Sequence, residues 1–92
     1  MDDADIKCRI VEKLLRNRVF GSKNWTVDRT VDHALPSHAQ GRGRQLLENE
    51  MIPQAEASIQ QYGGQRNAIK LTDADRAVEF LEEHGGNVPF GF

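Results

Sequence analysis

The sequence contains a single cysteine, Cys8, and no long hydrophobic run. A lone cysteine cannot form a disulfide within the chain, which favours an intracellular protein. No segment approaches the roughly 20 consecutive apolar residues that a membrane-spanning helix needs. The first residues, MDDADIKCR, are acidic and lack the apolar centre of a secretory signal. These absences predict a cytoplasmic protein that has no membrane partner.

Side chains suited to catalysis are also sparse. The tripeptide Gly21-Ser22-Lys23 lacks the earlier glycine that a phosphate-binding loop requires. The metal-ligating and nucleophilic residues have neither the spacing of a metal site nor that of a nucleophile–base pair. They are scattered at Cys8, His33, His38 and His84. We therefore expect neither an enzyme nor a bound metal or cofactor.

Charged residues are plentiful and unevenly distributed. The length of 92 residues predicts one domain, 1–92, with a core at about 5–84 and an apolar tail at 85–92. Residues 7–47 hold nine basic and three acidic side chains, whereas residues 48–92 hold three basic and eight acidic ones. A basic half is typical of a phosphate-binding face, although solvated helix surfaces produce the same pattern equally often.

The apolar pattern predicts four helices. In the first, Ile6, Ile10 and Leu14 recur at four-residue intervals, which places them on one face. Thr26 is a favourable N-cap for the second helix, and Thr72 for the fourth. The expected ranges are 3–18, 27–35, 38 to either 49 or 51, and a fourth helix that starts after Thr72 and ends at Gly85-Gly86.

A short turn separates the second and third helices. Pro36 ends the second helix, because proline lacks an amide donor and disfavours helical geometry in the preceding residue. Ser37 is then positioned to cap the third helix. Two helices joined by so little chain must cross steeply, as they do in a helix-turn-helix.

Two strand-like runs follow the third helix. Residues 58–62 and 68–71 flank Gly63-Gly64 and predict an antiparallel hairpin. Residues 23–26 could add a short third strand, and Trp25 should be at least half buried at the edge of the core.

This order of elements resembles the winged helix-turn-helix superfamily across about residues 5–84. The resemblance rests on the helix at 26–35, the Pro36-Ser37 turn, the helix at 37–51 and the hairpin at 59–71. It implies an α+β fold of about four helices with a two- or three-stranded antiparallel hairpin wing. It also implies binding of double-stranded DNA in transcription regulation, with the third helix in the major groove and the wing on the backbone. The mild acidity of the chain resembles that of archaeal, salt-adapted proteins.

The third helix and the wing carry the candidate DNA-binding residues. Arginine offers paired planar donors that match guanine edges or phosphates, and glutamine matches adenine. Arg42 and Arg44 flank the outer face of the helix, so both cannot reach one base edge. Gly41 on that face either lets a ligand approach the backbone or is merely tolerated. The complete set is Ser37, His38, Gly41, Arg42, Arg44, Gln45, Arg66 and Lys70.

A protein-docking or architectural role without DNA binding is the alternative. Winged helices also serve as protein-interaction modules, and typical DNA-binding domains are more basic overall. The tail concentrates apolar residues whose exposure would promote association, namely Val88, Pro89, Phe90 and Phe92. It is expected to fold back over the first and fourth helices, or else to dock on a second copy or a partner protein.

Overall fold

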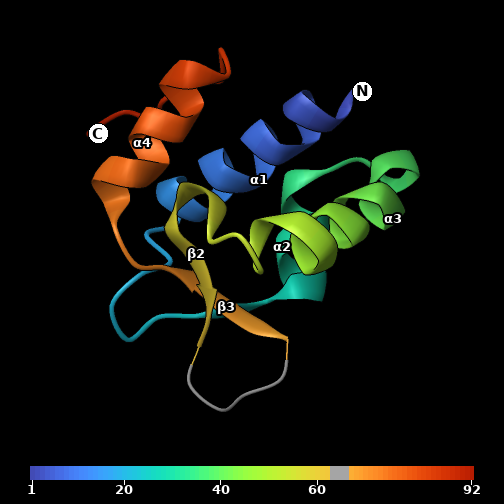
Figure 1. Cartoon of the computed structure of the whole chain (residues 1–92), viewed down its shortest axis with the longest axis horizontal. Helices are drawn as coiled ribbons and strands as arrows, with labels where there is room; N and C mark the ends of the chain where they lie inside the picture. The colour runs from blue at the N-terminus through green and yellow to red at the C-terminus, as the bar shows by residue number, and fades with distance from the viewer. Residues whose placement is uncertain (63–66) are drawn as a thin grey trace.

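In the computed structural model, which describes residues 1–62 and 67–92, the chain forms four α-helices and a small sheet (Figure 1). In chain order the elements are α1 (Asp3–Arg16), β1 (Trp25–Thr26), α2 (Val27–Ala34), α3 (Ser37–Leu46), β2 (Ile59–Gln61), β3 (Ala68–Leu71) and α4 (Ala74–Glu83). A π-helical turn, Leu47–Met51, continues α3, and a 3₁₀ turn, Glu56–Ser58, precedes β2. The expected α+β fold, with the element order of a winged helix, is confirmed. None of the helices described is long and apolar enough to cross a membrane.

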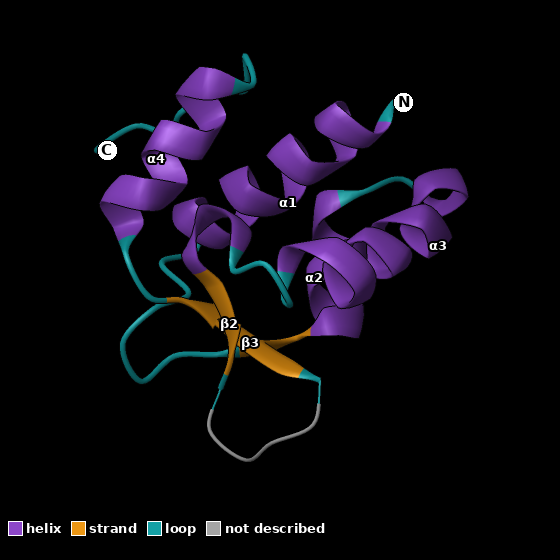
Figure 2. Cartoon of the chain, in the orientation of Figure 1, coloured by secondary structure: helices purple, strands orange, loops and turns teal. Residues whose placement is uncertain are grey.

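The sheet is antiparallel, and β3 is its middle strand in the order β1-β3-β2 (Figure 2). Trp25 of β1 pairs with Ile69, and Ile59 of β2 pairs with Leu71. Paired residues point to the same side of a sheet, and so do alternate residues of one strand. All four side chains are buried, and Trp25 is only 5% exposed. The third strand and the buried tryptophan are therefore as predicted, and this face of the sheet covers the core.

Helix α1 is the centre of the domain. Figure 1 shows it between α4 on one side and α2 and α3 on the other, and it contacts all three helices. Ile10, Val11 and Leu14 on its apolar stripe are completely shielded from solvent. The helix ends at Arg16, two residues before the predicted end, because Arg18 adopts a left-handed backbone with φ of 52°.

The turn between α2 and α3 consists of Leu35 and Pro36. Leu35 has the extended backbone expected before proline, with φ of −130° and ψ of 147°. The prediction that Ser37 caps α3 was wrong, since Ser37 is the first helical residue and Pro36 takes the cap position. The carbonyl of Pro36 accepts a hydrogen bond from the N–H of Ala39 at 3.0 Å. Gly43 permits the close approach of the two helices, because a Cβ there would overlap Leu35 Cδ1.

The cap of α4 also differs from the prediction. Asp73, not Thr72, caps the helix, and its carboxylate accepts hydrogen bonds from the N–H groups of Asp75 and Arg76 at 3.0 and 3.3 Å. The hydroxyl of Thr72 donates instead to the carbonyl of Ser58 at 3.1 Å. Contact with the segment before β2 therefore draws Thr72 away from the helix.

The end of α4 follows the sequence signal. Gly85 has a left-handed backbone with φ of 72°, and the N–H of Gly86 donates to the carbonyl of Leu81 at 2.8 Å. This is the hydrogen bond that closes a helix terminated by glycine.

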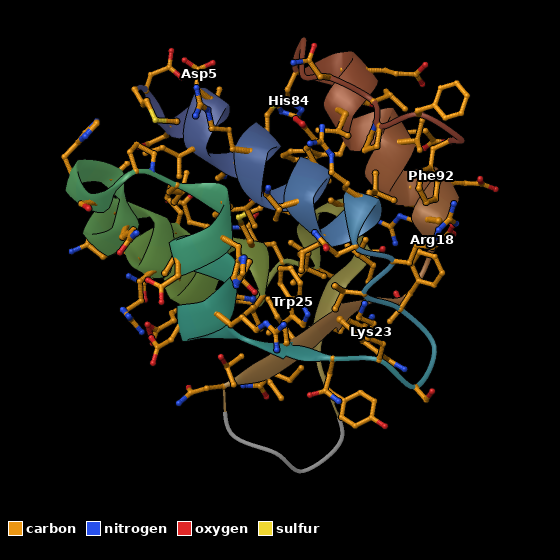
Figure 3. All side chains as sticks on the ribbon, turned by 180° about the vertical axis from the view of Figure 1, so that it is seen from behind. Asp5, Arg18, Lys23, Trp25, His84 and Phe92 are labelled. Atoms are coloured by element: carbon orange, nitrogen blue, oxygen red, sulfur yellow. The ribbon has the colours of Figure 1, made fainter. Side chains whose placement is uncertain are left out.

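The C-terminal tail folds back on the domain, with one exception. The Phe92 ring meets Phe20 edge-on at 6.4 Å, and the guanidinium of Arg18 lies 4.9 Å from the centre of the Phe92 ring (Figure 3). Val88 also packs against the core. Phe90, in contrast, is fully exposed. The tail therefore folds back on the core at Val88 and Phe92, as expected, but not at Phe90. The ring contacts of Phe92 are with Arg18 and Phe20, which follow α1.

Candidate nucleic-acid interface

The outer surface of α3 is formed by small and polar residues. Ser37, His38, Gly41 and Gln45 are all exposed, and their helical spacing places them on one face. A Cβ added to Gly41 would meet no described atom within 4 Å, so packing in the described part of the chain does not require glycine there. Four of the predicted contact residues are therefore brought together on one accessible surface.

Arg42 lies on one edge of this surface and reaches back to α1. Its Nε and Nη2 donate to the two carboxylate oxygens of Asp3 at 3.0 and 2.7 Å, and its Nη1 donates to Oε1 of Gln45 at 3.1 Å. The hydrogen bond from Arg42 lowers the pKa of Asp3 from its ordinary value, so this carboxylate is ionised at neutral pH. About half of each side chain remains exposed, which makes the pair a weak one despite its two-pronged geometry.

Arg44 lies on the opposite edge and pairs with Asp28 of α2. Residues two apart in a helix are separated by about 200° around its axis, which explains why the two arginines engage different neighbouring elements. Their flanking positions were predicted from the sequence. Their partners were not, because each acid comes from another helix and is found beside its arginine only after the helices pack.

The wing is the hairpin formed by β2 and β3. Of the two wing residues predicted to contact DNA, the structure describes Lys70. Its ammonium donates to the carbonyl of Gly21 at 3.0 Å and lies 5.2 Å from the centre of the Tyr62 ring. Lys70 therefore covers the loop before β1, and its described contacts do not bring it together with the arginines of α3. Arg66, the other predicted wing contact, lies outside the described residues.

Arg29 of α2 is a candidate residue that the sequence analysis missed. It is exposed, and its guanidinium lies 5.0 Å from the centre of the Trp25 ring, while the His33 ring lies 5.2 Å away on the same indole. The N–H of Val27 donates to the carbonyl of Asn67 at 2.7 Å, which ties the start of α2 to the wing. Arg29 is thus an exposed guanidinium in the first turn of α2, next in sequence to Asp28, the partner of Arg44. The four-residue spacing of Trp25 and Arg29 was the sequence signal from which their contact could have been predicted.

Part of the basic charge in the sequence is not available at the surface. The side chain of Lys7 is only 16% exposed, and its ammonium bonds the carboxylates of Glu50 and Glu56, each at 2.9 Å. Desolvation lowers the pKa of Lys7, but the hydrogen bonds that its ammonium donates to Glu56 and Glu50 outweigh this effect and leave the pKa raised. This ion pair joins α1 to the segment that leads from α3 to the wing, so its role is structural.

Three further features bear on the chemistry of the described residues. Within residues 1–62 and 67–92, no group of three or more His, Cys, Asp or Glu side chains is placed to hold a metal ion. Burial raises the pKa of the Cys8 thiol, which keeps it protonated. A polar hollow of about 320 Å³ is lined by Arg9, Glu12, Lys13, Ala34 and Asn87, none of which belongs to α3.

Comparisons of the chain with protein-family models, curated proteins and solved structures found no match. The likeness to a winged helix therefore rests on the order of the elements and the pairing of the strands.

Proposed function

We propose that the protein binds double-stranded DNA and acts in transcription regulation in the cytoplasm, with α3 in the major groove and the wing against the backbone. The observation that carries this proposal is the exposed outer surface of α3, which has an arginine on each long edge. The major groove, about 12 Å wide, admits an α-helix and is bordered by a phosphate backbone on both sides. Arginines on both edges of α3 suit contact with both backbones.

The residues between the arginines would face the bases. Gln45 can pair with an adenine edge, and Arg42 already bonds its amide oxygen at 3.1 Å, which orients the group. Ser37 and His38 lie in the first turn of α3, where backbone N–H groups favour a phosphate. Gly41 leaves room for a close approach to the backbone of the helix. Lys70 and Arg66 would supply wing contacts to phosphates.

Binding to random-sequence duplex DNA, measured by fluorescence anisotropy at two salt concentrations, tests this proposal. The logarithm of the binding constant should fall with the logarithm of salt by about 0.9 per phosphate contact. Arg42→Ala and Arg44→Ala should each weaken binding by about five- to a hundredfold. Arg76→Ala on α4 is the matched control and should bind like the wild type. Absence of binding at low salt, or equal affinity of all these variants, would contradict the proposal.

A protein-docking or architectural role is the second candidate, and the full exposure of Phe90 favours it. A second copy of the chain or a partner protein would then cover this ring. Sedimentation of the wild type and of Phe90→Ala separates the two candidates. A dimer that dissociates in Phe90→Ala, together with no affinity for DNA, would support docking.

A further inference from the structure

Both arginines on the edges of α3 are held by carboxylates that belong to other helices. Asp3, at the start of α1, takes two hydrogen bonds from Arg42, and Asp28, in the first turn of α2, pairs with Arg44. Neither acid is the cap of its own helix. Asp2 caps α1 through a bond of 2.8 Å to the N–H of Asp5, and Thr26 caps α2. The carboxylates of Asp3 and Asp28 therefore do not cap a helix and instead bind the arginines.

A carboxylate and a phosphate present the same chemistry to an arginine. Each offers two oxygens that match the planar fork of the guanidinium, and the Arg42–Asp3 pair has that two-pronged form. The oxygens of Asp3 and Asp28 consequently mark places where oxygens of a DNA backbone could bind. One such place lies on each edge of the exposed surface of α3.

Solvent exposure makes these contacts easy to exchange. The side chains of Arg42 and Asp3 are 47% and 51% exposed, and those of Arg44 and Asp28 are 47% and 66% exposed. Ion pairs this exposed contribute little to stability. A phosphate that replaced either carboxylate would nevertheless leave that carboxylate nearby, where its charge repels the incoming anion.

We propose that Arg42 and Arg44 form two phosphate subsites, one on each edge of α3, which Asp3 and Asp28 occupy in the absence of DNA. This inference rests on the DNA-binding function proposed above. The acids hold the arginines in position and compete with the phosphates, so the affinity for DNA is lower than the arginines alone would give.

Four single substitutions test the competition. Asp3→Asn and Asp28→Asn remove the competing charges, and Asp5→Asn and Asp32→Asn are their controls. Each control lies on the same helix as its counterpart, is exposed, and makes no ion pair within the described part of the chain. All four raise the net charge by one unit, so a general charge effect changes all four equally.

The readout is the affinity for random-sequence duplex DNA, with thermal unfolding to verify that each variant is folded. Removing a competing exposed pair should raise the affinity of Asp3→Asn and Asp28→Asn about two- to fivefold above that of their controls. The gain from Asp28→Asn should vanish when Arg44 is also replaced by alanine. Equal affinity of all four variants, with the wild type still bound through Arg42 and Arg44, would overturn this inference alone. No salt-dependent binding by the wild type or any variant would overturn it together with the proposed function.

Discussion

Lys7 and Arg16 both lie on α1 and both form ion pairs, but their surroundings differ. The side chain of Lys7 is 16% exposed and bonds two glutamates, whereas the side chain of Arg16 is 59% exposed and bonds Glu12. An exposed pair of this kind is screened by water and contributes little. Removing one partner from a pair shielded from water leaves an uncompensated charge, which costs considerably more.

Lys7→Met should therefore destabilise the protein by about 1–3 kcal/mol, because it leaves Glu56 without its partner in a largely buried position. Urea unfolding measures the difference. Arg16→Ala, the control on the same helix, should cost about 0.3–0.5 kcal/mol. Equal urea midpoints for the two variants would show that the ion pair of Lys7 contributes no more than a surface pair.

The stabilisation from Lys7 also has a defined pH dependence. Its raised pKa means that the folded protein binds this proton more tightly than the unfolded chain. Its contribution is complete below the ordinary value of 10.5 and is lost as the pH rises through the raised pKa. The difference in stability between wild type and Lys7→Met should be constant near neutral pH and shrink only in strongly alkaline solution.

The packing of α3 depends on two glycines with opposite environments. Gly43 faces α2 and α1, where an added Cβ would overlap Leu35 Cδ1 and lie 3.6 Å from Ile6 Cγ2. Gly41 faces outward, with no described atom within 4 Å of an added Cβ. Each glycine costs about 1 kcal/mol of helix propensity relative to alanine. Only at Gly43 does close packing of the helices offset that cost.

Alanine at the two positions should thus have opposite effects. Gly41→Ala should stabilise the protein by up to about 1 kcal/mol, because it improves helix propensity without a clash. Gly43→Ala gains the same propensity but overpacks the junction by about 1–3 kcal/mol, for a net loss of about 1 kcal/mol. Thermal unfolding of both variants measures this difference. A higher melting temperature for Gly43→Ala would mean that Leu35 moves aside without cost.

The whole molecule is organised around α1, which contacts the other three helices and β3. Its buried side chains belong to one core cluster together with buried residues of the other helices and of the sheet. The single tryptophan, Trp25, is buried where the sheet meets α2, so its fluorescence monitors unfolding of that part of the core. A domain this small, with one continuous core, should unfold in a single cooperative step.

Leu14→Ala should therefore destabilise the sheet and all the helices together. Leu14 is completely buried, and its truncation should cost about 2–5 kcal/mol. That is a large part of the total stability of a domain of this size, about 5–14 kcal/mol. Trp25 fluorescence and far-ultraviolet circular dichroism should report the same lowered urea midpoint. Separate midpoints for the two probes would show that the sheet and the helices unfold independently.

Features that depend on neighbouring residues could be predicted from the sequence alone. The apolar repeat of α1, the stop at Pro36, the alternation in β3 and the glycine that ends α4 are all local patterns, and each predicted its element. Periodicity also placed Arg42 and Arg44 on opposite edges of α3, since 100° per residue fixes that separation within any helix. Fold class and most of the candidate surface could be predicted for this reason.

The pairing of charged side chains depends on how the elements pack. Asp3 reaches Arg42, Asp28 reaches Arg44, and Lys7 reaches Glu56, each from a different element. Asp73 caps α4 in place of the predicted Thr72, because the hydroxyl of Thr72 bonds Ser58, 14 residues earlier in the sequence. Local patterns fix the face on which a side chain lies. Its partner depends on how the helices pack, and that packing sets which arginines of α3 are held by acids before any ligand arrives.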